Sequence, residues 1–156
     1  MHKKLTIALV AHDRRKEDMV DWAMYNAKVL SHHSLVCTGT TGRLIQEAFE
    51  SKGYNQVEIT RLNSGPLGGD AEIAALVVKK KVDLAVFLID DMSPQLHEAD
   101  IQMLLRQCRV HNVPIACNRY SADLMMTSSL WDEKNYSPLL PIYSPFYRSK
   151  EKEDYQ

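Results

Sequence analysis

Five apolar runs alternate along the chain with stretches of helical periodicity. An apolar run without polar alternation is typical of a strand that is buried on both faces. The predicted strands are residues 5–10, 34–37, 57–62, 83–89 and 114–117. Apolar residues spaced three and four apart predict helices from about residue 17 through Ala27, after Gly42, after Asp70, over about 98–111 and over about 121–129.

This alternation predicts an α/β fold with a doubly wound, flavodoxin-like, five-stranded parallel sheet and helices on both faces. The length of 156 residues suits one ordinary domain, so we predict a single domain over residues 1–156. Residues from about 137 to 156 are rich in Pro and Tyr and then in charge, which favours a C-terminal tail.

Composition and charge narrow the classes of partner. Hydrophobic residues make up 45% of the chain and charged residues 25%, as in ordinary globular proteins. With 19 basic against 20 acidic residues, the formal net charge is −1, so no basic excess favours nucleic acid as a partner. No apolar run approaches the ~18 residues that a membrane span needs, so we expect no membrane partner.

Three cysteines, Cys37, Cys108 and Cys117, lie in apolar runs and lack a CxxC spacing. This pattern favours reduced, buried thiols over a disulfide framework or a zinc site. The amino terminus runs directly into a predicted strand of about six residues, which is too short for the apolar core of a signal peptide. We therefore expect a cytoplasmic protein.

Polar and glycine-rich loops follow the first four predicted strands. They comprise His12 with Asp13, residues 38–42, residues 64–70 and residues 90–100. In a doubly wound sheet, ligands bind outside the carboxyl ends of the strands. We therefore expect these four loops to line one crevice, although they are far apart in the sequence.

The loop 38–42 has the sequence TGTTG, which places three hydroxyls and two glycines at a helix N-terminus. Backbone N–H groups and the helix dipole favour an anion there. The sequence is neither a Walker motif nor GxGxxG, so it does not indicate a nucleotide. Ser64 and Gly65 could extend an anion site, and Lys16 could supply charge. The alternatives are a threonine-capped helix start and a solvated lysine.

Four titratable side chains are candidates for acid–base chemistry: His12, Asp70, His97 and Asp100. Each has a structural alternative, because a histidine after a strand is often a satisfied core residue and an aspartate suits an N-cap or a first helical turn. Their spacings match no metal-ligand motif, so we expect no metal. We call the predicted anion site, formed by residues 38–42 with Lys16, Ser64 and Gly65, the anion cradle. A carboxylate and a neutral imidazole beside it suit proton abstraction next to the carbonyl of a phosphorylated sugar.

Taken together, the motifs resemble those of methylglyoxal synthases. They are Ala-His-Asp at residues 11–13, TGTTG at 38–42, SGPLGGD at 64–70, and His97 three residues before Asp100. The similarity runs from about residue 7 to residue 128 and includes the segment 118–123. The two glycine-bearing motifs in this order are together very specific.

The resemblance implies that dihydroxyacetone phosphate is converted to methylglyoxal and inorganic phosphate, without a metal or an organic cofactor, and that free phosphate inhibits. It implies that Asp70 is the base, that His97 lies against the carbonyl and enediolate oxygens, and that Asp100 pairs with Asp70. Arg106 matches a supporting arginine. The positions implied to bind the substrate or its phosphate are His12, Asp13, Lys16, Thr38, Gly39, Thr40, Thr41, Ser64, Gly65 and His97.

The C-terminal sequence departs from the pattern of the family. The family places an arginine near its C-terminus that reaches the phosphate of a neighbouring subunit, whereas the matching spacing here falls nearer Lys150 than Arg148. Lysine supplies charge without the bidentate fork of arginine. The resemblance also implies a closed homo-oligomer, usually a hexamer.

Two other functions stay open on the sequence alone. The fold resembles the regulatory domains of carbamoyl-phosphate synthetases, which bind effectors without doing chemistry and need no base. Another phosphosugar isomerase or lyase would use the same base and anion cradle. The combination of Asp70, His97 and Asp100 with the cradle favours an enzyme over a binding module.

Overall fold

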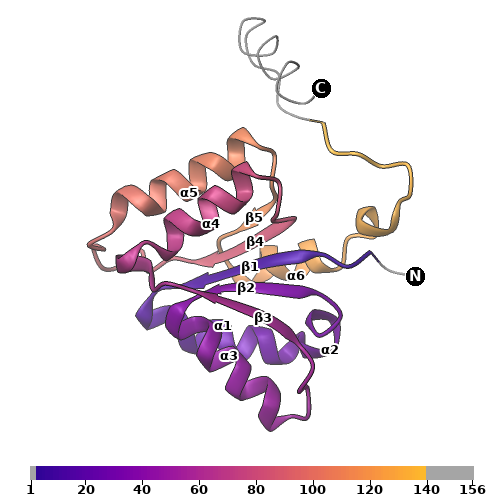
Figure 1. Ribbon diagram of the computed structural model, residues 1–156, viewed down its shortest axis with the longest axis horizontal. Helices are drawn as coiled ribbons and strands as arrows, with labels where there is room; N and C mark the ends of the chain where they lie inside the picture. The colour runs from indigo at the N-terminus through magenta and orange to yellow at the C-terminus, as the bar shows by residue number, and fades with distance from the viewer. Residues whose placement is uncertain (1–2, 140–156) are drawn as a thin grey trace, which may run out of the picture.

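A five-stranded parallel sheet forms the centre of the computed structural model, which describes residues 3–139 (Figure 1). The strands are β1 (Thr6–Ala11), β2 (Ser34–Thr38), β3 (Glu58–Leu62), β4 (Leu84–Leu88) and β5 (Ile115–Ala116). Their order is β3-β2-β1-β4-β5, and every neighbouring pair is parallel. The prediction of a doubly wound, flavodoxin-like sheet is therefore confirmed.

The helices connect successive strands, as the alternation predicts. They are α1 (Lys16–Tyr25), α2 (Ala27–Leu30), α3 (Gly39–Ser51), α4 (Gly69–Val78), α5 (Glu98–Val110) and α6 (Arg119–Met126). Short 3₁₀ turns occupy Asp13–Arg15, Gly65–Leu67 and Ser129–Asp132.

One predicted helix differs from the observed structure. The sequence predicts one helix from about residue 17 through Ala27, whereas the structure ends α1 at Tyr25 and starts α2 at Ala27. Between them, the side-chain amide of Asn26 donates to the Trp22 carbonyl and to Asp123 Oδ1. Local bonds of this kind compete with helical hydrogen bonding, and apolar periodicity does not report them.

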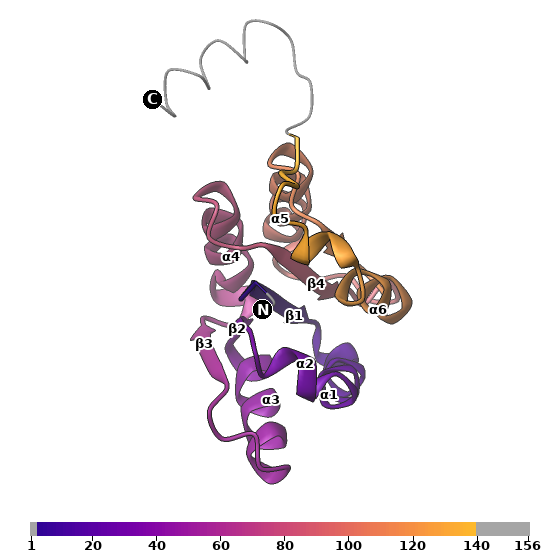
Figure 2. The same ribbon diagram turned by 90° about the vertical axis from the view of Figure 1, so that its right-hand side faces the viewer.

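The two faces of the sheet carry different helices (Figure 2). Helices α4 and α5 cover one face, where Ile73 and Leu104 pack with Val10 and Phe87 of the strands. Helices α1, α2, α3 and α6 cover the other face, where Trp22 is fully buried. Right-handed crossovers require this change of face, because the chain adds strands in one direction from β1 to β3 and in the other from β4 to β5.

The prediction of buried thiols is confirmed for Cys37 and Cys108 but is wrong for Cys117, which is exposed. Burial raises the pKa of Cys37 to about 12 and that of Cys108 to about 11. Strand β5 ends at Ala116 on the edge of the sheet. Cys117 therefore lies beyond the strand, in the loop that follows.

Among the helices within residues 3–139, none has both the length and the apolar character needed to cross a membrane. Arg148, Lys150 and most of the predicted tail lie outside the described residues. The predicted departure from the family's C-terminal arginine therefore stays a prediction.

Candidate active site

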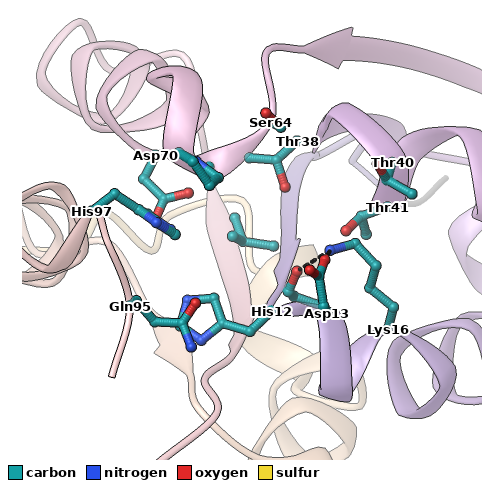
Figure 3. Close-up of a pocket in the computed structure, with 14 residues that line it drawn as sticks. His12, Asp13, Lys16, Thr38, Thr40, Thr41, Ser64, Asp70, Gln95 and His97 are labelled. Carbon is teal, nitrogen blue, oxygen red and sulfur yellow. Dashed lines mark hydrogen bonds and ion pairs between the residues drawn. The ribbon is translucent and has the colours of Figure 1, made fainter. Parts of the chain in front are cut away.

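Four loops at the carboxyl edge of the sheet enclose a cavity of about 280 Å³ (Figure 3). They follow β1, β2, β3 and β4, so segments far apart in the sequence converge as expected at this edge. Ten of the predicted site residues line the cavity: His12, Asp13, Lys16, Thr38, Thr40, Thr41, Ser64, Gly65, Asp70 and His97.

Asp70 is a buried carboxylate, with 0% of its surface exposed, in the first turn of α4. The N-cap position belongs to Gly68, and neither oxygen of Asp70 accepts a hydrogen bond from the described protein. The capping alternative for Asp70 is therefore wrong. Burial is the largest effect and raises the pKa of Asp70, whereas the nearby His97 lowers it. The charge of Asp100 raises the pKa further and that of Lys16 lowers it, and the net shift is upward.

His97 lies next to Asp70 at the N-cap position of α5, with its Nε2 3.4 Å from Asp70 Oδ2. Gly65 makes this arrangement possible. A Cβ at residue 65 would lie 2.6 Å from His97 Nε2 and 3.2 Å from Asp70 Oδ1, so a larger side chain would displace the pair. This close approach explains why the loop after β3 has a glycine directly after Ser64.

His12 presents a defined proton to the cavity. Its Nδ1 accepts a hydrogen bond of 2.8 Å from the backbone N–H of Asp90. The ring proton of neutral His12 is therefore on Nε2, which is buried and has no partner among the described residues. Burial lowers the pKa of His12, and nearby His97 lowers it further. His12 is thus a neutral hydrogen-bond donor.

Hydroxyls gather where α3 begins. Thr38 occupies its N-cap position, but its side chain makes no capping bond and lines the cavity instead. Thr41 is 1% exposed, and its buried Oγ1 has no partner in the described part of the chain. The first N–H groups of a helix lack intrahelical acceptors and favour an anion. Free hydroxyls beside such N–H groups fit an oxyanion such as phosphate.

Lys16 supplies a positive charge to the same side of the cavity. Its Nζ lies 2.6 Å from Asp13 Oδ1 and 3.2 Å from the carbonyl oxygen of Ala11. Asp13 is almost fully exposed, and its hydrogen bond from Lys16 lowers its pKa. Asp13 therefore holds the ammonium group of Lys16 at the rim of the cavity.

Three predicted residues lie outside the cavity wall: Gly39, Asp100 and Arg106. The N–H of Gly39 donates to the Asn63 carbonyl, and a Cβ there would lie 3.0 Å from the backbone nitrogen of Ser64. Gly39 thus lets the loops after β2 and β3 approach each other. Asp100 is half-buried in the first turn of α5 and acts on Asp70 through its charge, whereas Arg106 is exposed.

Gln95 lines the cavity and was not predicted. Its side-chain Nε2 donates to the Ser93 carbonyl at 3.2 Å, within the irregular loop between β4 and α5. Such a loop has no periodicity from which the direction of a side chain can be inferred. No signal in the sequence separates Gln95 from the polar residues around it.

Nitrogen and oxygen atoms of His12, Asp70 and His97 lie within 4.8 Å of one another, a spacing that a metal ion could bridge. A histidine that binds a metal normally donates its second ring N–H to an acceptor. His12 does the reverse, because its Nδ1 accepts from Asp90 and its Nε2 carries the proton. The donor set therefore does not fit a metal ion.

The comparisons with known proteins agree with one another. A family model for the MGS-like domain matches residues 18–117. A methylglyoxal synthase of Treponema socranskii is 67% identical over 95% of this chain and 93% of its own length. One from Pseudoalteromonas atlantica is 43% identical over 88% of this chain and 98% of its own length.

A solved structure is similar over nearly the whole chain. The crystal structure of a methylglyoxal synthase from Elizabethkingia anophelis NUHP1 superposes with a TM-score of 0.78 at 39% identity. The similarity covers 93% of this chain and 91% of that one. By sequence and fold, the chain belongs to the methylglyoxal synthase family and is thereby a carbon–oxygen lyase that eliminates phosphate.

Proposed function

We propose that this enzyme converts dihydroxyacetone phosphate to methylglyoxal and inorganic phosphate, with Asp70 as the catalytic base. The observation that carries the proposal is the fully buried carboxylate of Asp70, which accepts no hydrogen bond from residues 3–139 and lies in the same cavity as the anion cradle. A buried carboxylate in this state costs stability, and such groups concentrate at functional sites.

The two ends of the cavity suit the two ends of a triose phosphate. Lys16, Thr40 and Thr41 lie on one side, and Asp70 and His97 lie on the other (Figure 3). We place the phosphate at the lysine and threonine side, where the N-terminus of α3 adds its dipole. The hydroxymethyl carbon then lies toward Asp70.

In the first step, Asp70 removes a proton from the hydroxymethyl carbon, and the carbonyl becomes an enediolate. The raised pKa of Asp70 brings it closer to the operating pH, which suits a general base. His97 and the Nε2–H of His12 stabilise the negative oxygen, because donors in a buried site need no reorganisation at the moment of reaction.

In the second step, the electrons of the enediolate expel phosphate as the carbon–oxygen bond breaks. The enol product that remains tautomerises to methylglyoxal. Thr38, Thr41 and Lys16 would stabilise the departing phosphate with the same groups that bind the substrate. An isomerase acting on this substrate would instead retain the phosphate and return the proton to the neighbouring carbon.

The alternative is an effector-binding domain of the same fold, which needs the cradle but no base. Such a domain would gain nothing from burying an Asp70 carboxylate that accepts no hydrogen bond from the described residues, since an apolar or hydrogen-bonded residue there would be more stable. The burial of Asp70 therefore favours catalysis over binding alone.

Incubation of the purified protein with dihydroxyacetone phosphate tests the proposal, with methylglyoxal and free phosphate assayed in parallel. We expect both products in equal amounts. Glyceraldehyde phosphate as the product would instead indicate an isomerase, and binding without turnover would indicate an effector domain. The homohexamer and the cytoplasmic location also stay predictions, and the mass of the assembly in solution tests the first.

A further inference from the structure

One peptide group, between Ile89 and Asp90, connects the end of β4 to the imidazole of His12. Its N–H donates to His12 Nδ1 at 2.8 Å. Its carbonyl oxygen accepts a hydrogen bond of 3.2 Å from Arg15 Nη1. The orientation of this peptide group is therefore set at both ends, by two residues that follow β1.

The neighbouring side chains hold this arrangement in place. Asp90 is buried, and its Oδ1 accepts the backbone N–H of Met92 at 3.0 Å, which makes an Asx turn directly after the peptide group. Arg15 is held in turn by Asp18, whose Oδ2 lies 3.2 Å from Arg15 Nε. A guanidinium on the carbonyl polarises the peptide and strengthens its N–H as a donor.

The orientation of the peptide group determines which ring nitrogen of His12 carries the proton. A backbone N–H can only donate, so His12 Nδ1 must offer a lone pair and Nε2 must carry the proton. If the peptide were reversed, its carbonyl would face Nδ1, the proton would move there, and Nε2 would become an acceptor. The ring itself is held edge-on between Phe87 and His97, at centroid distances of 5.3 and 5.6 Å.

We propose that Arg15 and Asp90 are positioning residues that fix the Ile89–Asp90 peptide and thereby keep His12 as the neutral tautomer donating from Nε2. The charged and titratable groups that act on His12 are His97, Asp90, Lys16 and Glu98. The contact of His12 with substrate rests on the proposed function. The tautomer does not, because it follows from contacts within the protein.

The first test is ¹⁵N NMR of the histidine rings in the wild-type protein at neutral pH, without substrate. We expect an unprotonated Nδ1 and a protonated Nε2 for His12. A protonated Nδ1, in either the other tautomer or the imidazolium, would overturn the proposal. Because this readout needs no turnover, it is independent of any failure of the proposed reaction.

The second test compares variants of Asp90. Asp90→Ala removes the Asx turn and is expected to mix the His12 tautomers and to lower kcat about tenfold or more, with a smaller change in KM. Asp90→Asn keeps an oxygen acceptor for the Met92 N–H and is expected to retain the single His12 tautomer and the wild-type kcat. Asp91→Ala, at the exposed neighbouring residue, is the matched control.

A second pair of variants tests the hydrogen bond between Arg15 and the carbonyl oxygen of the peptide group. Arg15→Ala is expected to shift the His12 tautomer in the same direction, whereas Arg14→Ala, at an exposed residue, is not. Wild-type tautomer and kcat in both Asp90→Ala and Arg15→Ala would refute the positioning role. An equal loss of kcat and of the single His12 tautomer in Asp90→Asn and Asp90→Ala would show that the Asx turn does not fix the peptide group.

Discussion

Thr41 buries a hydroxyl that makes no hydrogen bond within residues 3–139. A hydroxyl that is 1% exposed and makes no such bond adds nothing to the stability of the fold and costs desolvation energy. A phosphate oxygen would supply the missing partner, since it is a strong and charged acceptor. A bound phosphate would therefore account for the burial of the Thr41 hydroxyl, which no hydrogen bond within residues 3–139 explains.

Thr41→Val should weaken inhibition by inorganic phosphate about tenfold or more, because it removes a hydrogen bond to a charged group. The same substitution should leave the Tm of the phosphate-free protein unchanged or higher, since no internal bond is lost. Inhibition curves and thermal melts measure the two effects. Thr60→Val, on exposed β3, is the control. Unchanged phosphate inhibition in Thr41→Val would remove Thr41 from the cradle.

Most cavity residues were predictable because each directly follows a strand or opens a helix. His12 and Thr38 are of this kind, and their neighbours in space follow from the rule for the carboxyl ends of parallel strands. The proton position on His12 was not predictable, because it depends on a backbone N–H 78 residues away. Gln95 was missed for a different reason, since the direction of its side chain is set by an irregular loop that has no periodicity.

At the scale of elements, the N-termini of α4 and α5 bring two carboxylates close enough to influence each other. Asp70 lies in the first turn of α4 and Asp100 in the first turn of α5, and these helices pack side by side on one face of the sheet. A helix N-terminus favours the ionised carboxylate, whereas a second carboxylate opposes it. Asp100 therefore raises the pKa of Asp70 without lining the cavity.

Asp100→Asn should shift the acidic limb of the pH profile of kcat/KM to lower pH. Asp70 must be ionised to act as a base, and removal of the Asp100 charge lowers its pKa. The measurement is kcat/KM against pH for this variant and for Glu98→Gln, which removes a carboxylate from the same turn of α5. A shift to higher pH, or equal shifts in both variants, would contradict the role of Asp100.

The elements themselves were predictable where their apolar pattern is regular, and less so where side chains interrupt it. The five strands and their helices follow from hydrophobic runs and spacing. The break at Asn26 and the exposure of Cys117 depend on a local side-chain bond and on the end of an edge strand. Neither changes the hydrophobic pattern that a sequence displays.

At the scale of the whole molecule, the buried carboxylate of Asp70 lowers the free energy of unfolding at neutral pH. A buried carboxylate with a raised pKa favours folding only while it is protonated, so its contribution falls as the pH rises through the folded-state pKa. At neutral pH, Asp70 therefore destabilises the fold that holds it. Active sites often show this opposition between stability and function.

Asp70→Asn should raise the Tm at pH 7, because the amide has a similar shape and no charge to desolvate. The gain should be about 2–4 °C for each kcal/mol recovered in a chain of this size. The difference should shrink as the pH falls through the raised folded-state pKa and close below 3.8, the ordinary pKa of an aspartate, where residue 70 is uncharged in the folded and unfolded forms of both proteins. A lower Tm at pH 7 would mean that the ionised carboxylate stabilises the fold.

The turnover of Asp70→Asn on dihydroxyacetone phosphate tests whether Asp70 is the catalytic base. We expect kcat to fall about 10³-fold, because the amide cannot accept the proton. The inhibition constant for inorganic phosphate should stay close to that of the wild type, since the cradle is intact, and Asp91→Asn should behave as the wild type. Turnover of Asp70→Asn near the wild-type rate would show that another group is the base.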